Sequence, residues 1–414
     1  MARVKEEPAN FFTKTGKGQP PLQGLRVLEL GSMIAGPFAA RLFAEFGAEV
    51  IKIEPPDGGD PLRTWRHLYQ GTSLWWYVQS RNKKSITLDL RQSGAREIVL
   101  QLAAKADVLI ENFKPGTMEK WGLGWDDLEK VNPGLIMVRV SGYGQTGPYR
   151  NKAGFGSIGE AMGGIRYLTG YPDRPPTRVG VSLGDSVAGL YAFIGGLLAL
   201  RHREVRQGKG QVVDVALYEA VFSLMEGLLP EYSALGVIRE RTGTILPGIA
   251  PSNTYCCADG KYIVIGGNSD GIFKRLMLAV GRPDLAEDPR LARNDGRVTH
   301  MAEIDEAISA WTATKSIDEA LEAMDRAGVP AGKIYNAADI AADPHYRARG
   351  MVQETEIPGL GKILVPGLVP GLSETPGEVR WLGPELGAHN EEIYCGLLGY
   401  PREMLKQWRE KGLI

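Results

Sequence analysis

Short β-rich runs alternate with helical patterns through the first half of the chain, and this alternation constrains the fold more than any other feature. Helical patterns such as PFAARLFAEFG and SGAREIVLQLAAKA separate several of the runs, and a later strand-like segment is followed by YEAVFSLMEGLL. The alternation predicts an α/β fold with a doubly wound, mostly parallel, Rossmann-like sheet covered by helices. The predicted strands are RVLELG (26–31), EVIKIE (49–54), SITLDL (85–90), DVLIEN (107–112), LIMVRVSG (135–142) and QVVDVAL (211–217).

The pattern changes near residue 230, where LPGIAPSNTYCCADGKYIVIGG suggests a loop and antiparallel strands, and MAEIDEAISAWTATKSIDEALEAMDRAG suggests two short helices. A chain of 414 residues is long enough for two or three domains. We therefore predict a large α/β domain from residues 1–226, with an irregular polar tail at 1–21. A small α+β domain is inserted at 227–334, and residues 335–414 return as a linker and complete the large domain.

Bulk charge favours neither nucleic acid nor an anionic membrane as a partner, because 48 Lys and Arg residues oppose 49 Asp and Glu residues. The three cysteines, Cys256, Cys257 and Cys395, fit neither a disulfide framework nor metal-ligand spacing. The N-terminal segment lacks the apolar core of a signal peptide, and the longest apolar run, 187–200, is too short to span a bilayer. We expect a cytoplasmic protein with no metal and no nucleic-acid or membrane partner.

Several familiar catalytic motifs are missing from the sequence. It contains no GxSxG, GxxxxGK[ST], HExxH or CxxC segment. The first predicted strand is followed by Gly31 and Gly36, which do not form GxGxxG, so a nicotinamide enzyme is not expected. The five histidines are scattered along the chain, and each is interpreted as structural or exposed.

One acid stands out in GVSLGDSVAGLYA (180–192), where Asp185 lies between a Gly-rich turn and an apolar helical run. The structural interpretation is a helix N-cap, since Asp accepts an unpaired backbone N–H there. The functional interpretation uses the same place: the helix dipole keeps the carboxylate ionised, and an ionised carboxylate is a nucleophile. The two interpretations are compatible.

Longer segments carry a family resemblance. In chain order they are AGPFAARLFAEFGAEVIKIEPPDGGDPLR, NKKSITLDLR, ENFKPGTMEKWGLGWDDLEKVNP, SGYGQTGPY, the Asp185 segment, GVPAGKIYNAADIAADPHYRARGM and PELGAHNEEIYCGLLGY. Together they resemble the family III coenzyme A transferases, the CaiB/BaiF family, over roughly residues 22–400. The resemblance implies a CoA-transferase that forms an interlocked homodimer, with CoA and acyl-CoA as substrates and no separate cofactor.

The resemblance also implies a mechanism. The Asp that matches Asp185 attacks the donor thioester and gives an aspartyl anhydride, which the CoA thiolate converts into an aspartyl-CoA thioester. An acceptor acid then enters, and the two steps run in reverse. Anhydrides and thioesters both keep the acyl group activated, so a carboxylate suits this role.

The positions that match the family's CoA contacts are assigned by the resemblance alone. Without it, the cations among them would be interpreted as ordinary surface charges. The residues expected along the pantetheine path are Ile34 and Ala35; those expected near the nucleotide and its phosphates are Leu88, Asp89, Leu90, Arg91, Asn112, Phe113, Lys114 and Lys120; and those expected to bind CoA beside the active Asp are Phe155 and Gly156.

The chain also departs from the family. Many relatives carry an acid where this chain has Gly156, and Glu160, one helical turn later, is a candidate substitute or a structural residue. The GGGGQ loop of the formyl-CoA branch is absent, which disfavours oxalate. Gly266 and Gly267 could take over its shielding role or form an ordinary turn at a strand end.

Two other functions are alternatives to CoA transfer. An α-methylacyl-CoA racemase needs a His-Asp proton-transfer pair, and Phe155 and Gly156 occupy those places. A non-catalytic acyl-CoA binding protein would keep Asp185 only as a cap. For a transferase we expect succinyl-CoA as donor and a C4 to C6 dicarboxylate as acceptor, whose second carboxylate would pair with an arginine fork; the candidates are Arg63, Arg166 and Arg178.

Overall fold

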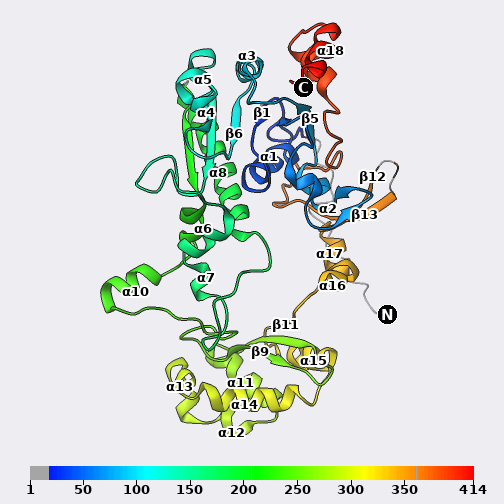
Figure 1. The fold of residues 1–414 in the computed structure, drawn as a ribbon. Coiled ribbons are helices and arrows are strands. Elements are labelled where there is room, and N and C mark those ends of the chain that lie inside the picture. The colour runs from blue at the N-terminus through cyan, green and yellow to red at the C-terminus, as the bar shows by residue number, and fades with distance from the viewer. Residues whose placement is uncertain (1–17, 207, 358, 360) are drawn as a thin grey trace. The chain divides into compact units, whose positions relative to one another are not determined.

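The computed structural model describes residues 18–206, 208–357, 359 and 361–414 (Figure 1). The described residues form two compact units. The first contains residues up to 166 together with 179–237 and 344–414, and the second contains 167–178 and 238–343. Most of the expected tail lies outside the described residues. These contact-based units do not test where independently folding domains begin and end, so the limits at 227 and 334 stay a prediction.

The first unit is built on a six-stranded parallel sheet in the order β5-β2-β1-β6-β7-β8, which confirms the expected parallel α/β sheet. Its members are β1 (Arg26–Glu29), β2 (Glu49–Glu54), β5 (Lys83–Thr87), β6 (Val108–Glu111), β7 (Ile136–Ser141) and β8 (Val212–Ala216). Strand β5 ends before the expected limit of 90: the Leu88 N–H makes the last bond to β2, at the Glu54 carbonyl, and the Asp89 N–H already turns to the Leu413 carbonyl.

Successive residues of the strands point into two different cores, as expected for a sheet buried on both faces. Val27 packs with α1 (Ala35–Glu45) and α8 (Leu183–Arg206) on one face. Leu28 packs on the other face with α3 (Ser93–Ala103) and the C-terminal segment, whose helix α18 (Arg402–Glu410) is red in Figure 1. Residues from both ends of the chain therefore build one unit.

Helix α8 is longer than the apolar run predicted from sequence. Its 24 residues are long and apolar enough to cross a membrane by length and composition alone, and among the described residues it is the single helix that meets this test. Core helices of soluble proteins pass the same test. Gly189 and Gly196 bring the helix against the Ala35 carbonyl and the Phe43 ring, where a Cβ atom would lie 2.9 Å and 2.8 Å from these groups.

The remaining elements of the first unit are short helices and two hairpins. The single helix expected for YEAVFSLMEGLL is wrong: the chain forms two helices, because the segment between them turns at Glu226, whose φ is 49°. The elements are α2 (Leu74–Gln79), α4 (Thr117–Lys120), α5 (Trp125–Val131), α6 (Gly156–Met162), α9 (Leu217–Phe222), α10 (Leu228–Leu235), α17 (Pro344–Ala348), β3 (Leu68–Tyr69) with β4 (Thr72–Ser73), and β12 (Val352–Ile357) with β13 (Gly361–Pro366). Helix α7 (Ile165–Leu168) crosses the boundary of the two units.

The second unit has the antiparallel strands and the two helices expected from sequence. Strand β10 pairs with β9 and β11 in an antiparallel sheet, and a separate apolar core includes Ile263 and Leu276. Its elements are β9 (Ser252–Cys256), β10 (Tyr262–Gly266), β11 (Ala331–Lys333), α11 (Asp270–Ala279), α12 (Pro283–Ala286), α13 (Asn294–Thr299), α14 (Met301–Thr312), α15 (Ile317–Ala327) and α16 (Ala337–Ala342).

Candidate active site

The topology of the sheet selects one edge for a ligand. From β1 the chain proceeds to β2 and β5 on one side, and β6, β7 and β8 lie on the other side. The direction of winding therefore reverses between β1 and β6. In open α/β sheets such a reversal leaves a crevice at the carboxyl ends of the two strands, and ligands bind there.

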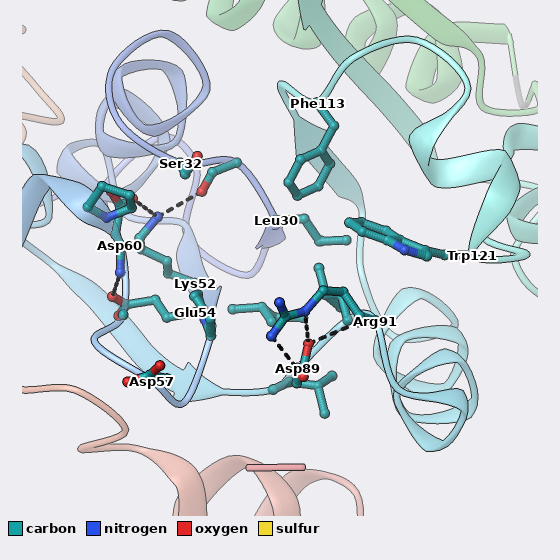
Figure 2. Close-up of a pocket in the computed structure, with 17 residues that line it drawn as sticks. Leu30, Ser32, Lys52, Glu54, Asp57, Asp60, Asp89, Arg91, Phe113 and Trp121 are labelled. Atoms are coloured by element: carbon teal, nitrogen blue, oxygen red, sulfur yellow. Dashed lines mark hydrogen bonds and ion pairs between the residues drawn. The ribbon is translucent and has the colours of Figure 1, made fainter. Parts of the chain in front are cut away.

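A pocket of about 490 Å³ lies at this edge (Figure 2). Loops that follow β1, β2, β5 and β6 all contribute to it, so four carboxyl ends converge on one cavity. Its lining residues are Leu30, Gly31, Ser32, Lys52, Ile53, Glu54, Pro55, Asp57, Gly59, Asp60, Pro61, Leu88, Asp89, Leu90, Arg91, Phe113 and Trp121. Five of the expected CoA-binding residues are among them.

One wall of the pocket is apolar and aromatic. Phe113 and Trp121 meet edge to face, with ring centroids 5.1 Å apart and an interplanar angle of 81°. Figure 2 shows both rings beside Leu30. A planar apolar ligand group gains both burial and ring contacts against such a wall.

The pocket also carries charge, at Arg91 and Asp89, which Figure 2 shows near Leu30 and Trp121. Arg91 forks onto Asp89, with Nε 2.8 Å from Oδ1 and Nη2 3.1 Å from Oδ2. Hydrogen bonding to Arg91 lowers the pKa of Asp89. The Arg91 side chain is 76% exposed, so its guanidinium can change partner without unfolding the loop.

A buried ion network forms the floor of the pocket, and the sequence analysis assigned no role to its members. Lys52 Nζ lies 2.7 Å from Glu29 Oε1 and 2.8 Å from Asp60 Oδ2, and donates to the Gly31 carbonyl at 2.9 Å. Burial acts to lower the pKa of Lys52, but the neighbouring carboxylates outweigh it and raise that pKa. The sequence contains a signal for this network, because Lys52 lies between Ile51 and Ile53 in a strand of a sheet predicted to be buried.

The network and Asn112 together shape the loop that follows β1. The Asn112 amide pairs with the Ser32 backbone in both directions, at 2.9 Å each. Gly31 is required beside it, since a Cβ would lie 2.8 Å from Asn112 Oδ1. Asp60 accepts the N–H of Met33, whose φ of 66° is unusual for a residue with a side chain. Asn112 therefore acts behind the pocket rather than in its lining.

Asp185 lies in a second cluster of the same unit, in the first turn of α8. It is the third residue of the helix, so the expected N-cap position is wrong. Its carboxylate lies directly against Gly156, the first residue of α6: a Cβ built on Gly156 would be 2.0 Å from Asp185 Oδ2. The missing side chain at Gly156 is therefore what gives the carboxylate its space.

The surroundings of Asp185 favour its charged form less than a helix N-cap would. Burial, and then the negative charge of Glu160, raise the pKa of Asp185 to about 6. Among the described residues no hydrogen bond to the Asp185 carboxylate offsets these effects. The group is thus ionised at neutral pH but more basic than an ordinary aspartate.

Ile34 and Ala35 connect the pocket to the Asp185 cluster. They directly follow the Gly31–Met33 loop and are buried; Ile34 is the N-cap residue of α1, and Ala35 is its first residue. The Ala35 carbonyl approaches Gly189, which is one helical turn beyond Asp185 on α8. The chain thus connects the rim of the pocket directly to the Asp185 face of α8.

Other expected residues are not brought into either cluster. Lys114 and Lys120 are exposed beside the aromatic wall and do not line the pocket, and Phe155 is 67% exposed. Gly266 and Gly267 belong to the second unit, where Gly267 packs tightly on Leu276: a Cβ there would be 2.5 Å from Leu276 Cδ2.

The three candidate arginines have different environments. Arg63 forks onto Glu54, donates to the Pro384 carbonyl and lies 3.7 Å from the centre of the Trp76 ring, so each of its three nitrogens already has a partner. Arg178 belongs to the second unit. Arg166 pairs with Glu160, Nη2 to Oε2 at 3.1 Å, in the cluster of Asp185.

Comparison with known proteins gives a consistent result. Residues 22–390 match the family described as CoA-transferase family III. A succinyl-CoA–D-citramalate CoA-transferase of Chloroflexus aurantiacus is 56% identical, over 95% of this chain and 98% of the relative. A succinyl-CoA–L-malate CoA-transferase alpha subunit of the same species is 43% identical, over 97% of this chain and 94% of the relative. The crystal structure of a CaiB/BaiF family protein from Brucella suis matches with a TM-score of 0.82 at 37% identity, over 92% of this chain and 100% of that protein.

Proposed function

Since the chain belongs to CoA-transferase family III, we propose that it transfers CoA from succinyl-CoA to a dicarboxylic acid, with Asp185 as the nucleophile. The observation that carries the proposal is the placement of this acid. Asp185 is ionised at neutral pH, is raised in basicity by burial and lies against a residue without a side chain. Such a carboxylate can attack a thioester.

The proposed chemistry has two reversible stages. An Asp185 oxygen forms a bond to the thioester carbonyl carbon, the C–S bond breaks, and the electron pair leaves on the CoA sulfur. The thiolate then attacks the aspartyl carbonyl of the anhydride and releases succinate. The acceptor carboxylate attacks the resulting aspartyl-CoA thioester, and the same two steps in reverse deliver its CoA ester. Both intermediates need protection from water, which the burial around Asp185 supports.

We place the CoA nucleotide in the pocket at the β1 and β6 ends. The adenine would lie on the wall of Phe113 and Trp121, and the phosphates would extend toward Arg91. The pantetheine would follow the chain past Ile34 and Ala35 to Asp185. Lys114 and Lys120 are exposed next to the aromatic wall and remain candidates for phosphate contact.

We propose a C4 to C6 dicarboxylate as acceptor, with malate and citramalate as the first candidates. The support is the naming of the two relatives for L-malate and D-citramalate. Of the three candidate arginines, Arg166 fits best, since all three nitrogens of Arg63 already have partners and Arg166 lies in the Asp185 cluster. The family also supports an interlocked homodimer, and we propose that the protein works as one in the cytoplasm.

Two rival functions are weaker. A racemase needs a second proton-transfer group beside the substrate, and Phe155 supplies none. A non-catalytic acyl-CoA binder is separated from the transferase by Asp185→Ala, which should abolish exchange while CoA affinity changes little.

A trapping experiment tests the nucleophile and the acceptor together. The enzyme is incubated with succinyl-CoA, and hydroxylamine is added to one portion and a panel of acids to another. We expect peptide mass spectrometry to find a hydroxamate at Asp185, and malate and citramalate to form CoA esters at least tenfold faster than carnitine or acetate, which have no second carboxylate to pair. Labelling at a different acid would overturn the nucleophile. If carnitine or a monocarboxylate formed its CoA ester faster than every dicarboxylate, the proposed acceptor class would be wrong, while the assignment as a CoA-transferase would stand.

The nucleotide placement is tested at Arg91. Arg91→Ala should weaken CoA binding about three- to tenfold, because a charge-assisted contact to phosphate is lost, and should leave pantetheine binding unchanged. The matched control is Arg96→Ala, since Arg96 is also exposed but pairs with Asp127 outside the pocket lining. Equal losses for CoA and pantetheine in Arg91→Ala would contradict the placement. Calorimetry measures both affinities.

A further inference from the structure

Glu160 on α6 is a buried acid beneath the first turn of α8. Its side chain is 2% exposed, and its Oε1 accepts the Gly184 N–H at 3.3 Å. The two helices meet closely here, since a Cβ on Gly184 would lie 3.1 Å from Glu160 Cγ and 3.1 Å from the Gly156 carbonyl. Glu160 therefore touches the residue immediately before Asp185, and its α6 neighbour Gly156 touches Asp185 itself.

Arg166 anchors the other side of the same carboxylate. Its Nη2 lies 3.1 Å from Glu160 Oε2. The Glu160 carboxylate is thus fixed at both oxygens, one to the α8 turn and one to a guanidinium. A buried acid held in this way has a defined position as well as a charge.

Glu160 is the charged group that acts on Asp185 most directly. The other charged groups on the elements packed around α8 are engaged elsewhere. On α9, Glu219 is exposed and accepts from Tyr218 at 3.0 Å. On β8, Asp214 accepts the Gln145 N–H at 2.9 Å. On α1, Arg41 lies 3.1 Å from Glu45, and on β7, Arg139 lies 2.7 Å from Glu111. Of all these groups, Glu160 is the one whose charge bears on the Asp185 carboxyl.

We infer that Glu160 is a positioning residue for the transfer reaction: it holds the first turn of α8 through Gly184 and places a fixed negative charge beside the Asp185 carboxylate. This inference rests on the proposed function, since it takes Asp185 as the nucleophile. Arg166 contributes by fixing the second oxygen of the Glu160 carboxylate.

The charge matters because the nucleophile loses its own charge when it reacts. In the free enzyme two carboxylates repel each other. When the Asp185 oxygen bonds to the acyl carbon, the C–S bond breaks and the electron pair leaves on sulfur, so Asp185 becomes a neutral anhydride and no proton is transferred. The repulsion from Glu160 is then relieved. This relief favours the neutral anhydride over the ionised Asp185 of the free enzyme.

Glu160→Gln tests this directly, because the amide oxygen can still accept the Gly184 N–H while the charge is gone. The readout is the single-turnover rate of succinate release from succinyl-CoA between pH 4.5 and 8, measured without hydroxylamine because hydroxylamine itself protonates in this range. In the wild type the acid limb should have its midpoint near 6, the pKa of Asp185. In Glu160→Gln the midpoint should fall by about 0.5 to 1 pH unit, and the plateau rate should fall about two- to threefold, since a less basic carboxylate is a weaker nucleophile.

Two further variants separate charge from packing. Glu160→Asp keeps the charge but withdraws the carboxylate from Gly184 by one methylene, so its midpoint should stay within about 0.3 pH unit of wild type even if the rate falls. It also provides a test if Glu160→Gln does not fold, because a midpoint as low as that expected for the amide would overturn the inference. Glu219→Gln removes a carboxylate from α9, outside the site, and should change neither midpoint nor rate.

The outcomes distinguish this inference from the proposed function. A wild-type acid limb in a folded Glu160→Gln would overturn the role of Glu160 and leave Asp185 as the nucleophile. Absence of a hydroxamate at Asp185 in the wild type would overturn the proposed function, and with it this inference. A lowered midpoint in Glu160→Gln with an unchanged one in Glu160→Asp supports both.

Discussion

At Gly156 the reactive carboxylate occupies the space that a side chain would take. The family resemblance predicts an acid at this position, and the chain instead has its acid, Glu160, one helical turn further along α6. The acid therefore approaches Asp185 from beneath the α8 turn rather than from Gly156. The exchange is local, because residues four apart on a helix lie on the same face.

Gly156→Ala should abolish transfer without unfolding the protein. The new Cβ would lie 2.0 Å from Asp185 Oδ2, a distance that forces the carboxylate out of its position, and we expect at least a hundredfold loss of kcat. Gly180→Ala is the matched control, because Gly180 lies in the same segment as Asp185 and nothing lies within 4 Å of its Cβ position. The comparison uses kcat and the melting temperature. Full activity in Gly156→Ala would contradict the placement of Asp185.

At the same scale, the sequence predicted the chemistry of Asp185 better than its environment. The acid in GVSLGDSVAGLYA could be identified as a nucleophile candidate, but it was expected at an N-cap that favours its charge. In the structure it is the third residue of α8 and its pKa is raised to about 6. The burial and the approach of Glu160 come from the packing of α6 on α8, which a sequence pattern does not contain.

At the scale of elements, long apolar patterns were predictable and short polar connections were not. Strand β2 has the predicted limits, since EVIKIE is bounded clearly and buried on both faces. Strand β5 ends at Thr87 because its partner strand β2 ends at Glu54 and the Asp89 N–H turns to the distant Leu413 carbonyl. The break between α9 and α10 depends on Glu226 in a left-handed conformation, which a glutamate in the sequence does not indicate.

The loop from Gly31 to Met33 illustrates what requires tertiary structure. Its positive φ at Met33 is stabilised by Asp60, which Lys52 holds in turn. These residues are distant in sequence and meet at the floor of the pocket. Five of the expected CoA residues do line that pocket, because the family motifs follow the ends of strands and parallel strands bring those ends to one edge.

At the scale of the whole molecule, the reactive acid should make the folded protein less stable. The pKa of Asp185 is about 6 when folded and near 3.8 when exposed. Between these values the folded state binds more protons than the unfolded state, so the contribution of Asp185 to stability falls as the pH rises, and the full cost remains above pH 6. A shift of about two pKa units corresponds to up to about 3 kcal/mol.

Asp185→Asn should therefore stabilise the protein in a pH-dependent way. Asn has the same size and no charge, so the variant should exceed wild type in free energy of unfolding by up to about 3 kcal/mol at pH 8 and by about 1 kcal/mol at pH 4.5, where the folded wild type is already protonated. Urea unfolding of the full chain at the two pH values measures the difference. The control is Glu219→Gln, exposed on α9, whose difference from wild type in free energy of unfolding should be the same at both pH values. A constant gap between Asp185→Asn and wild type would mean that folding does not change the ionisation of Asp185, and that the burial of this carboxylate carries no cost in stability.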